Sequence, residues 1–304
     1  MRVGLVGTED SIRRHIQSLH ELALVEISGY LCPEKHDNLS DIGAPFFHPQ
    51  AFEAFINQSD AFIFSGTGME YYHYAIQAIR NTRHVFFDQY VLDLPARLSE
   101  IQKLSIEANT RVQIRNDKRT HPAWKYAMKM VTGPQYAEFL VSEMPAMPGI
   151  SSENWVKRLA MDIDLLFDVV NIGIRRTSPT GISVMQKDID LLNLKLEFVN
   201  GFAANLNYRV MPDTRVDRCI FYEKGSVIDI DFLNCSVIRK SQAEHKKFSI
   251  VNNSGPDSEL EHFLERLLSQ EKSFANTRYD QVLPLQIAQQ TVEKIQHRRP
   301  VLSM

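Results

Sequence analysis

The sequence lacks the features that would assign it at once to several large classes of protein. Only three of its 304 residues are cysteine, and none is in Cys-x-x-Cys spacing. Isolated thiols exclude a disulfide-stapled fold and favour a reducing compartment. No apolar run approaches the ~20 residues that span a bilayer. The apolar N-terminal stretch ends at Thr8, which is too early for a signal peptide. We therefore expect a cytoplasmic protein with no membrane segment.

An excess of positive charge is also missing. The 34 Lys and Arg residues are balanced by 37 Asp and Glu, for a net charge of −3, so we expect no nucleic-acid partner. No His-Glu-x-x-His, Walker or Gly-x-Ser-x-Gly motif is present, and we expect no metal site. The apolar share of 44% is that of an ordinary globular chain. The length predicts two domains.

In the first part of the chain, short apolar runs alternate with helical patterns. Parallel strands need crossover connections, so strands that alternate with helices predict a parallel sheet covered on both faces. We predict an α/β fold that begins with a Rossmann-like, doubly wound domain over residues 1–119. The runs expected as strands are residues 3–7, 24–31, 61–65, 83–87 and 111–115.

The pattern changes in the second half. Residues 181–251 form a series of strands with period-two alternation, and Asn200-Gly201 is a strong hairpin signal. Hairpins without intervening helices indicate an antiparallel sheet. We predict a C-terminal α+β domain over residues 120–304, with a large, mostly antiparallel sheet. The C-terminal helix, residues 283–297, is expected to return to the first domain.

Four motifs resemble those of the Gfo/Idh/MocA oxidoreductases, and they follow in the family's order over nearly the whole chain. They are HYAIQAIRNTRHVF at 73–86, RNDKRTHPAW at 115–124, MDIDLL at 161–166 and LEFVNGFAANL at 196–206. The resemblance implies a Rossmann domain followed by a substrate and oligomerisation domain. It also implies transfer of a hydride between NAD or NADP and a sugar-like or polyol-like hydroxyl.

The cofactor positions depart from this family. Its first strand ends in a glycine-rich turn that admits a pyrophosphate. Here Glu9 and Ile12 stand where the second and third glycines belong, and Cys32 replaces the acidic residue that often binds a ribose. NAD or NADP is the expected cofactor if any is bound. The remaining candidates for cofactor binding are Gly7, Thr8, Ser65, Gly66, Asp88 and Gln89.

The catalytic positions also differ. The family's Glu-Lys-Pro motif aligns with Asp88-Gln89-Tyr90, and its helical aspartate and histidine align with Lys157 and Met161. Glutamine and methionine do not transfer protons near neutral pH. Tyr90 and Lys157 are the remaining catalytic candidates, although an ion pair with Asp164 is an alternative role for Lys157. The candidates for the substrate cleft are Arg119, His121, Lys125, Met161 and Asp164.

Two functions remain open. One is an oxidoreductase with an altered site, supported by the retained two-domain pattern. The other is a pseudoenzyme that serves as a ligand sensor or an inactive partner subunit, supported by the loss of the lysine, aspartate and histidine together. A small-molecule ligand suits both.

The resemblance further implies a homodimer or a larger homo-oligomer, formed through the open face of the second sheet. An antiparallel sheet buries one face and leaves the other exposed, so cover by the chain's own helices is the alternative for any apolar face. The apolar residues expected on the oligomer face are Val184, Leu192, Leu194, Leu196, Phe198, Leu206 and Tyr208.

Overall fold

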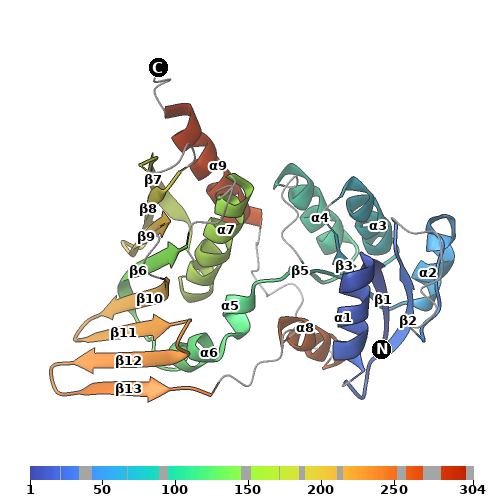
Figure 1. Ribbon diagram of the computed structural model, residues 1–304, viewed down its shortest axis with the longest axis horizontal. Helices are drawn as coiled ribbons and strands as arrows, with labels where there is room; N and C mark the ends of the chain where they lie inside the picture. Colours follow the sequence, from blue (N-terminus) through green and yellow to red (C-terminus); the bar gives the residue numbers. More distant parts are fainter. Residues whose placement is uncertain are drawn as a thin grey trace. The chain divides into compact units, whose positions relative to one another are not determined.

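The chain forms two compact units in the computed structural model (Figure 1). One unit comprises Met1–Asn116 and Gly255–Val282, and the other comprises Asp117–Ser254 and Leu283–Met304. The structure describes residues 1–20, 22–33, 43–66, 68–88, 95–144, 152–170, 172–184, 189–210, 215–251, 258–269 and 282–298.

The first unit is a five-stranded parallel sheet in the order β2-β1-β3-β4-β5. Apolar residues of α1 and α8 pack on one face, and aromatic residues of α2 pack on Phe62 on the other. Because both faces are covered, a strand such as β3 is a continuous apolar run. The elements are β1 (Arg2–Gly7), α1 (Glu9–Leu19), β2 (Glu26–Leu31), a 3-10 turn (Pro49–Ala51), α2 (Phe52–Gln58), β3 (Ala61–Ser65), α3 (Met69–Arg80), β4 (His84–Phe87), α4 (Pro95–Glu107), β5 (Val112–Ile114) and α8 (Ser258–Leu268).

The second unit contains an eight-stranded sheet in the order β13-β12-β11-β10-β6-β9-β8-β7. Its neighbouring strands are antiparallel except for β6 and β9. The hairpin expected at Asn200-Gly201 joins β8 to β9, with Gly201 at a φ of 88°. The elements are α5 (Asp117–Thr120), α6 (Pro122–Met128), β6 (Pro134–Glu143), α7 (Ser152–Val169), β7 (Ile174–Ile182), β8 (Leu191–Phe198), β9 (Ala203–Val210), β10 (Val216–Glu223), β11 (Ser226–Asp231), β12 (Ser236–Ser241), β13 (His245–Ser249) and α9 (Val282–Arg298).

The two C-terminal helices belong to different units from those expected. Leu260 and Phe263 of α8 are buried in the core of the first unit, whereas Ile295 of α9 lies so close to Gly181 of β7 that a Cβ there would overlap it. The prediction that residues 283–297 return to the first domain was therefore wrong. Both helices carry an apolar face, but an apolar face alone does not determine which of the two sheets the helix packs on.

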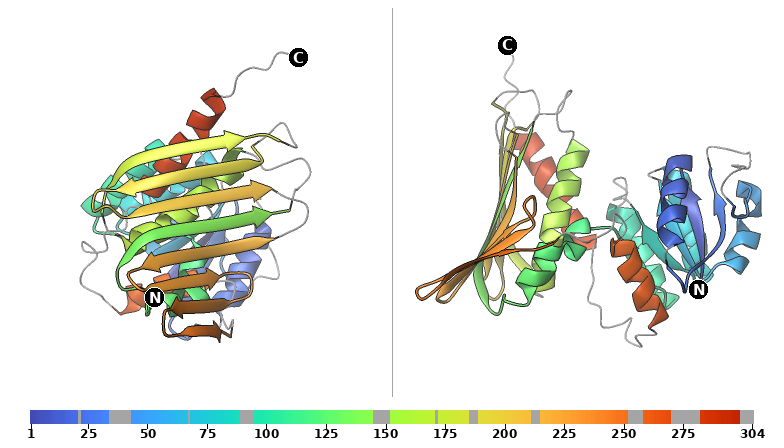
Figure 2. Two further views of the ribbon diagram at one scale, coloured as in Figure 1. Left: turned by 90° about the vertical axis from the view of Figure 1, so that its left-hand side faces the viewer. Right: turned by 60° about the horizontal axis from the view of Figure 1, so that its bottom comes forward.

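Helices α7 and α9 cover one face of the large sheet, and no helix of the described residues lies over the opposite face (Figure 2). Phe198 lies on the covered face, where its ring contacts Phe167 of α7 at 6.0 Å. The oligomer face predicted from the apolar residues was therefore wrong, since all but the exposed Val184 are buried beneath the chain's own helices. The buried residues are Leu192, Leu194, Leu196, Phe198, Leu206 and Tyr208.

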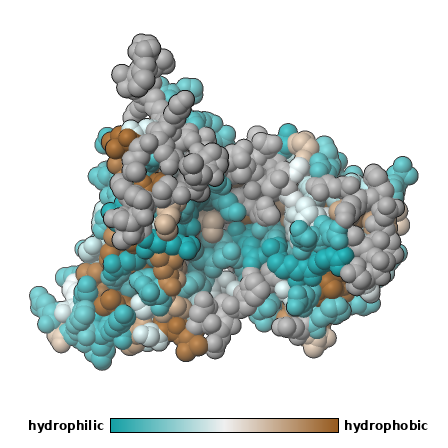
Figure 3. All heavy atoms as spheres, in the orientation of Figure 1, coloured by the Kyte–Doolittle hydropathy of each residue, from teal (hydrophilic) through white to brown (hydrophobic). Residues whose placement is uncertain are grey.

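Apolar residues on the surface of Figure 3 appear as separate patches. Among the described residues, no helix is long and apolar enough to cross a membrane.

Candidate functional site

The carboxyl ends of β1 and β3 lie side by side in the first sheet. Gly7 and Ser65 are paired in register there. This is the topological switch point of the sheet, because β2 lies on one side of β1 and β3 on the other. Open α/β sheets bind ligands outside this edge. A Cβ at Gly7 would lie 2.5 Å from Ser11 Oγ, so a larger residue there would displace the Ser11 hydroxyl. Thr8 is the N-cap of α1 and donates a hydrogen bond to Ser11 Oγ at 3.1 Å.

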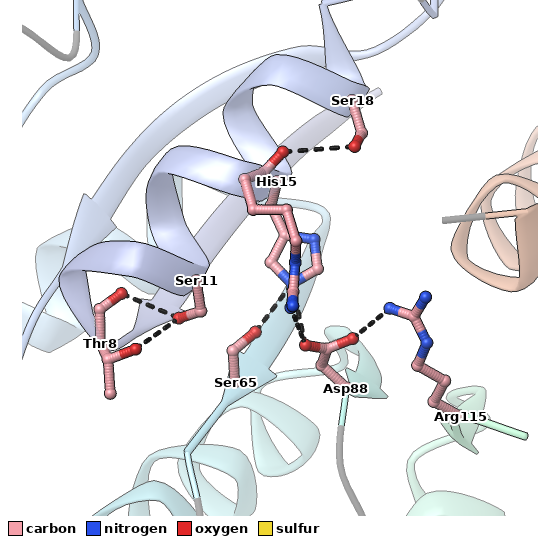
Figure 4. Close-up of polar contacts among 8 residues, drawn as sticks. Thr8, Ser11, His15, Ser18, Ser65, Asp88 and Arg115 are labelled. Atoms are coloured by element: carbon pink, nitrogen blue, oxygen red, sulfur yellow. Dashed lines mark hydrogen bonds and ion pairs between the residues drawn. The ribbon is translucent and has the colours of Figure 1, made fainter. Parts of the chain in front are cut away.

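Five polar residues converge at this edge, and we call them the Asp88 cluster: Arg14, His15, Ser65, Asp88 and Arg115 (Figure 4). Asp88 directly follows β4 and accepts hydrogen bonds from Arg14 of α1 and from Arg115 after β5, the latter at 2.5 Å. His15 Nε2 lies 2.9 Å from Ser65 Oγ and 3.3 Å from Asp88 Oδ2. The Asp88 carboxylate therefore gathers donors from two segments of the chain, helix α1 and the residue after β5.

The Asp88 carboxylate stays charged at neutral pH. Burial alone would raise its pKa, but the hydrogen bond and charge of His15 and those of Arg115 outweigh burial and hold the pKa below 3.8. The Asp88 side chain is 2% exposed, whereas the Arg14 side chain is 48% exposed. Arg14 is thus bound to a buried anion and is still accessible to a ligand.

The first turn of α1 carries a second ion pair. Glu9 Oε1 accepts from Arg13 Nη2 at 2.8 Å and Nε at 3.1 Å, so the charge of Glu9 is balanced within the helix. Ile12, at the third glycine position, is 1% exposed and belongs to the core. Neither replacement leaves an unbalanced negative charge in the turn.

The other predicted site residues of this unit either have a packing role or lie outside the described residues. Gly66 has a packing role, because a Cβ there would overlap the ring of Tyr71 in α3. Gln89 and Tyr90 lie outside the described residues. Arg14, His15 and Arg115 were not among the predicted site residues. Arg115 opens the motif at 115–124, whereas Arg14 and His15 lie outside the four motifs.

In the second unit, Asp164 is bound by Arg119, whose Nε also lies 3.6 Å from Asp168. Lys157 is exposed, and the expected pair between Lys157 and Asp164 was wrong, since Arg119 from α5 reaches that carboxylate. Burial, followed by repulsion from Asp164, raises the pKa of Asp168 to about 6 against the opposing charge of Arg119.

The remaining cleft candidates do not form a shared site in the described structure. His121 is the N-cap of α6, where its Nδ1 accepts from Ala123 N at 3.3 Å. Burial is the main reason that the pKa of His121 lies below 6.5. Lys125 is exposed, and Met161 is half-buried on α7. Arg119 and Asp164 of this set are brought together as an ion pair.

The second unit also holds a buried polar network that the sequence did not indicate, and we call it the Lys118 cluster: Lys118, Arg158, Asp162, Tyr208 and Asp217. Lys118 Nζ donates to Asp162 Oδ1 at 2.6 Å and to Asp217 Oδ1 at 2.7 Å. Arg158 donates to Asp217 and Tyr208 donates to Asp162, both at 2.8 Å. Asp162 is fully buried, which indicates a structural role.

The fit to possible ligands follows from these donor sets. Among the residues that the structure describes, no group of three or more His, Cys, Asp or Glu side chains is arranged to hold a metal ion. The edge with the Asp88 cluster suits the phosphates of a dinucleotide, since it combines the N-terminus of α1, the hydroxyl of Ser65 and the half-exposed guanidinium of Arg14.

No protein-family model matches the chain, and no curated protein matches it.

Comparison by structure finds the same fold in solved proteins. UDP-N-acetylglucosamine 3-dehydrogenase GnnA from Acidithiobacillus ferrooxidans has a TM-score of 0.79 at 16% identity, over 97% of this chain and 96% of that chain. The dehydrogenase MviM from Clostridium difficile has a TM-score of 0.77 at 14% identity, over 98% and 99%. Biliverdin reductase from Synechocystis sp. PCC 6803, solved with biliverdin and NADP⁺, has a TM-score of 0.68 at 13% identity, over 97% and 98%.

These neighbours are dehydrogenases and reductases of the Gfo/Idh/MocA type. The chain has their two-domain fold from end to end. The resemblance drawn from four short motifs is therefore confirmed in the architecture, as is the predicted pairing of a doubly wound parallel sheet with a large, mostly antiparallel one.

Proposed function

We propose that this chain binds NAD or NADP at the carboxyl edge of its five-stranded sheet. It is an oxidoreductase by descent that acts on a sugar-like or polyol-like hydroxyl, with an activity altered by the loss of the usual catalytic groups. Its fold and the dehydrogenase and reductase neighbours support this proposal.

The observation that carries the proposal is the half-exposed guanidinium of Arg14 at that edge. Arg13, Arg14 and Arg115 balance the three carboxylates there, which are Glu9, Asp10 and Asp88. The positive end of the α1 dipole adds an attraction for anions. Guanidinium groups bind phosphate oxygens through charge-assisted hydrogen bonds. Arginine side chains would thus perform the task that backbone amides of a glycine-rich turn perform elsewhere.

The chemistry would divide between cofactor and protein. A nicotinamide ring supplies the hydride or accepts it, and the protein positions it and handles the proton. General acid–base catalysis contributes ~10²–10⁴-fold, and Met161 occupies the position of the family's histidine. Lys157 and Tyr90 are the remaining candidate acid–base groups. We therefore expect turnover to be slower by about that factor.

The same absence supports a second candidate, a non-catalytic ligand sensor or inactive partner subunit. Gln89 and Met161 both replace residues that move protons in the family. A sensor would keep the ligand site and have no need for those groups.

The binding step is tested by titrating the purified protein with NADH and NADPH, followed by calorimetry and by nicotinamide fluorescence. We expect micromolar binding. Replacing Arg14 by Gln should weaken it about tenfold, the contribution of one hydrogen bond to a charged group. Arg80→Gln on α3 is the matched control, since Arg80 is also exposed. Absence of binding at millimolar dinucleotide would overturn the proposal.

A screen of sugars and polyols then separates the two candidates. Turnover that falls in Lys157→Ala or Tyr90→Phe supports the altered enzyme. Tight dinucleotide binding without turnover of any substrate favours the sensor or inactive subunit. Light scattering tests the predicted homo-oligomer independently of both.

A further inference from the structure

A pocket lies on the face of the eight-stranded sheet opposite α7 and α9, the face toward the viewer in Figure 2, left. Its volume is about 480 Å³. Pockets that hold small organic ligands range over roughly 300–1,000 Å³. All residues that line it belong to the second unit, so it is separate from the edge that carries the proposed dinucleotide site.

Strand register explains how one row of the pocket floor is built. Thr180, Asn193, Asn207, Leu140 and Arg218 are paired in succession across β7, β8, β9, β6 and β10. Directly paired residues in neighbouring strands point to the same face of a sheet. The row therefore presents a hydroxyl, two amides and a guanidinium in a line, interrupted by one leucine.

The neighbouring row, two residues along each strand, is mainly apolar. Ile182 pairs with Leu191, Leu191 pairs with Arg209, and Ser142 pairs with both Arg209 and Val216. A polar row beside an apolar row gives the pocket two unlike sides. Pockets that bind small molecules combine an apolar lining with a few placed polar groups in this way.

The amides in the polar row are held in position by their neighbours. Asn193 Nδ2 donates to the Oδ1 atoms of Asn205 and Asn207, both at 2.7 Å, and Asn207 Nδ2 donates to Glu138 Oε1 at 3.3 Å. Fixed amide groups lose little conformational freedom when a ligand binds. A chain of bonds thus orients the polar side of the pocket before any ligand arrives.

The charge of the pocket has one sign. Its lining includes Arg209 and Arg218 and no aspartate or glutamate. Arg218 is bound to Asp229 through Nε and Nη2, which leaves Arg209 as the exposed cation of the lining. Ser142, in the same row as Arg209, is 1% exposed, and its Oγ has no hydrogen-bond partner within the described chain.

We propose that this pocket binds a small organic anion, with its acidic group on Arg209, hydrogen-bonding groups on the Asn193–Asn207 pair and an apolar part against Leu191 and Ile182. The acidic group would be a carboxylate or a phosphate, since both make paired hydrogen bonds to guanidinium. This inference adds a second ligand site to the protein and does not depend on dinucleotide binding.

The test uses 8-anilinonaphthalene-1-sulfonate as a probe, because it joins one anionic group to an apolar ring system and fluoresces when bound. We expect saturable binding at one site in the second unit. Arg209→Gln should weaken it about tenfold. Thr180→Trp should abolish it by filling the pocket from an exposed position, which leaves the core unchanged. Arg239→Gln, an exposed arginine on β12 outside the pocket, should bind as the wild type does.

Two further measurements keep the outcome clear. Probe binding that falls in Arg14→Gln and not in Arg209→Gln would place the probe at the first unit and overturn the proposal. Competition by benzoate but not by phenyl phosphate would identify a carboxylate site, and the reverse order a phosphate site. If Thr180→Trp changes the mass in light scattering and Arg209→Gln leaves probe affinity unchanged, the face is a contact between two copies and the proposal fails.

Discussion

Two clusters of charged residues, one in each unit, differ in how much water reaches them. In the Asp88 cluster the carboxylate is buried, but the Arg14 side chain is 48% exposed. In the Lys118 cluster the Lys118 side chain is 8% exposed and Asp162 is fully buried. The first cluster retains a cation that a ligand can reach. The second encloses Lys118 and Asp162, whereas its Arg158 side chain is 25% exposed.

The solvent exposure of the charged groups distinguishes a binding role from a structural role better than the residue types do. Breaking a buried pair leaves an uncompensated charge in a medium of low polarity and costs about 3–5 kcal/mol, whereas an exposed pair contributes about 0–1 kcal/mol. Substitutions in the buried Lys118 cluster should therefore lower the free energy of unfolding and leave ligand binding unchanged. Substitutions in the partly exposed Asp88 cluster should weaken ligand binding and have less effect on stability.

The largest expected effect on the free energy of unfolding is in the Lys118 cluster. Asp162→Asn removes a carboxylate that accepts from Lys118 and Tyr208. Lys118 would then keep Asp217, which it shares with Arg158, whereas Arg158 is also paired with Glu143. We expect the free energy of unfolding to fall by about 3–5 kcal/mol, measured by urea denaturation. Asp10→Asn, at an exposed position, is the control. A loss below about 1 kcal/mol would mean that water already reaches the Lys118 cluster.

A smaller loss is expected for Asp88→Asn, about 1–2 kcal/mol, since Arg14 can be hydrated once its partner is neutral. The pH dependence has a definite sign. The folded-state pKa of Asp88 lies below 3.8, so its contribution is present above pH 3.8 and is lost as pH falls through the folded value. Denaturation curves of variant and wild type should converge in strong acid. A constant difference down to pH 2 would contradict the assignment.

Asp168→Asn should change stability in the other direction. The pKa of Asp168 is raised to about 6 in the folded state from 3.8, so its ionisation destabilises the fold as pH rises through about 6. The neutral amide should raise the free energy of unfolding by on the order of 1 kcal/mol above pH 6, with no gain near pH 3.5. Thermal unfolding at the two pH values measures this. An equal gain at both would show that packing is responsible.

The smallest effect is expected for Glu9→Gln in the turn before the Asp88 cluster. The Glu9–Arg13 pair is partly exposed and spaced i,i+4, so its loss should cost only about 0.2–0.5 kcal/mol. Removing the carboxylate should at the same time tighten NADH binding, because one negative charge near the phosphates is gone. Weaker NADH binding in this variant would show that Glu9 itself contacts the ligand.

How far the sequence predicted the structure depended on the range of the interaction. The strand at residues 61–65 was placed correctly, because a strand buried on both faces is a continuous apolar run. The hairpin at Asn200-Gly201 was also correct, because a tight turn is specified by its own residues. Patterns such as these can be recognised from residues that are adjacent in the sequence.

The candidate site was harder to predict, because its members are distant along the chain. Arg14 is separated from Asp88 by 74 positions and Arg115 by 27, and no spacing rule joins them. The alternation in β8 predicted two faces correctly, but not which face α7 and α9 would cover. The turn after the strand at 61–65 suggested Gly66, which has a packing role. Arg14 and Arg115 were not predicted as site residues, although Arg115 opens the motif at 115–124.

The placement of α8 also constrains the order in which the protein can form during translation. Phe263 meets Phe86 with ring centroids 5.3 Å apart, and the Glu259 side chain accepts from Asn116 N and from Gln113 Nε2. The sheet that begins at Arg2 therefore lacks part of its cover until residue 264 has left the ribosome. At about 5–20 residues per second, that wait exceeds the time needed to synthesise the strands themselves. A nascent chain of this protein must keep an incomplete domain from aggregating while the other domain is being made.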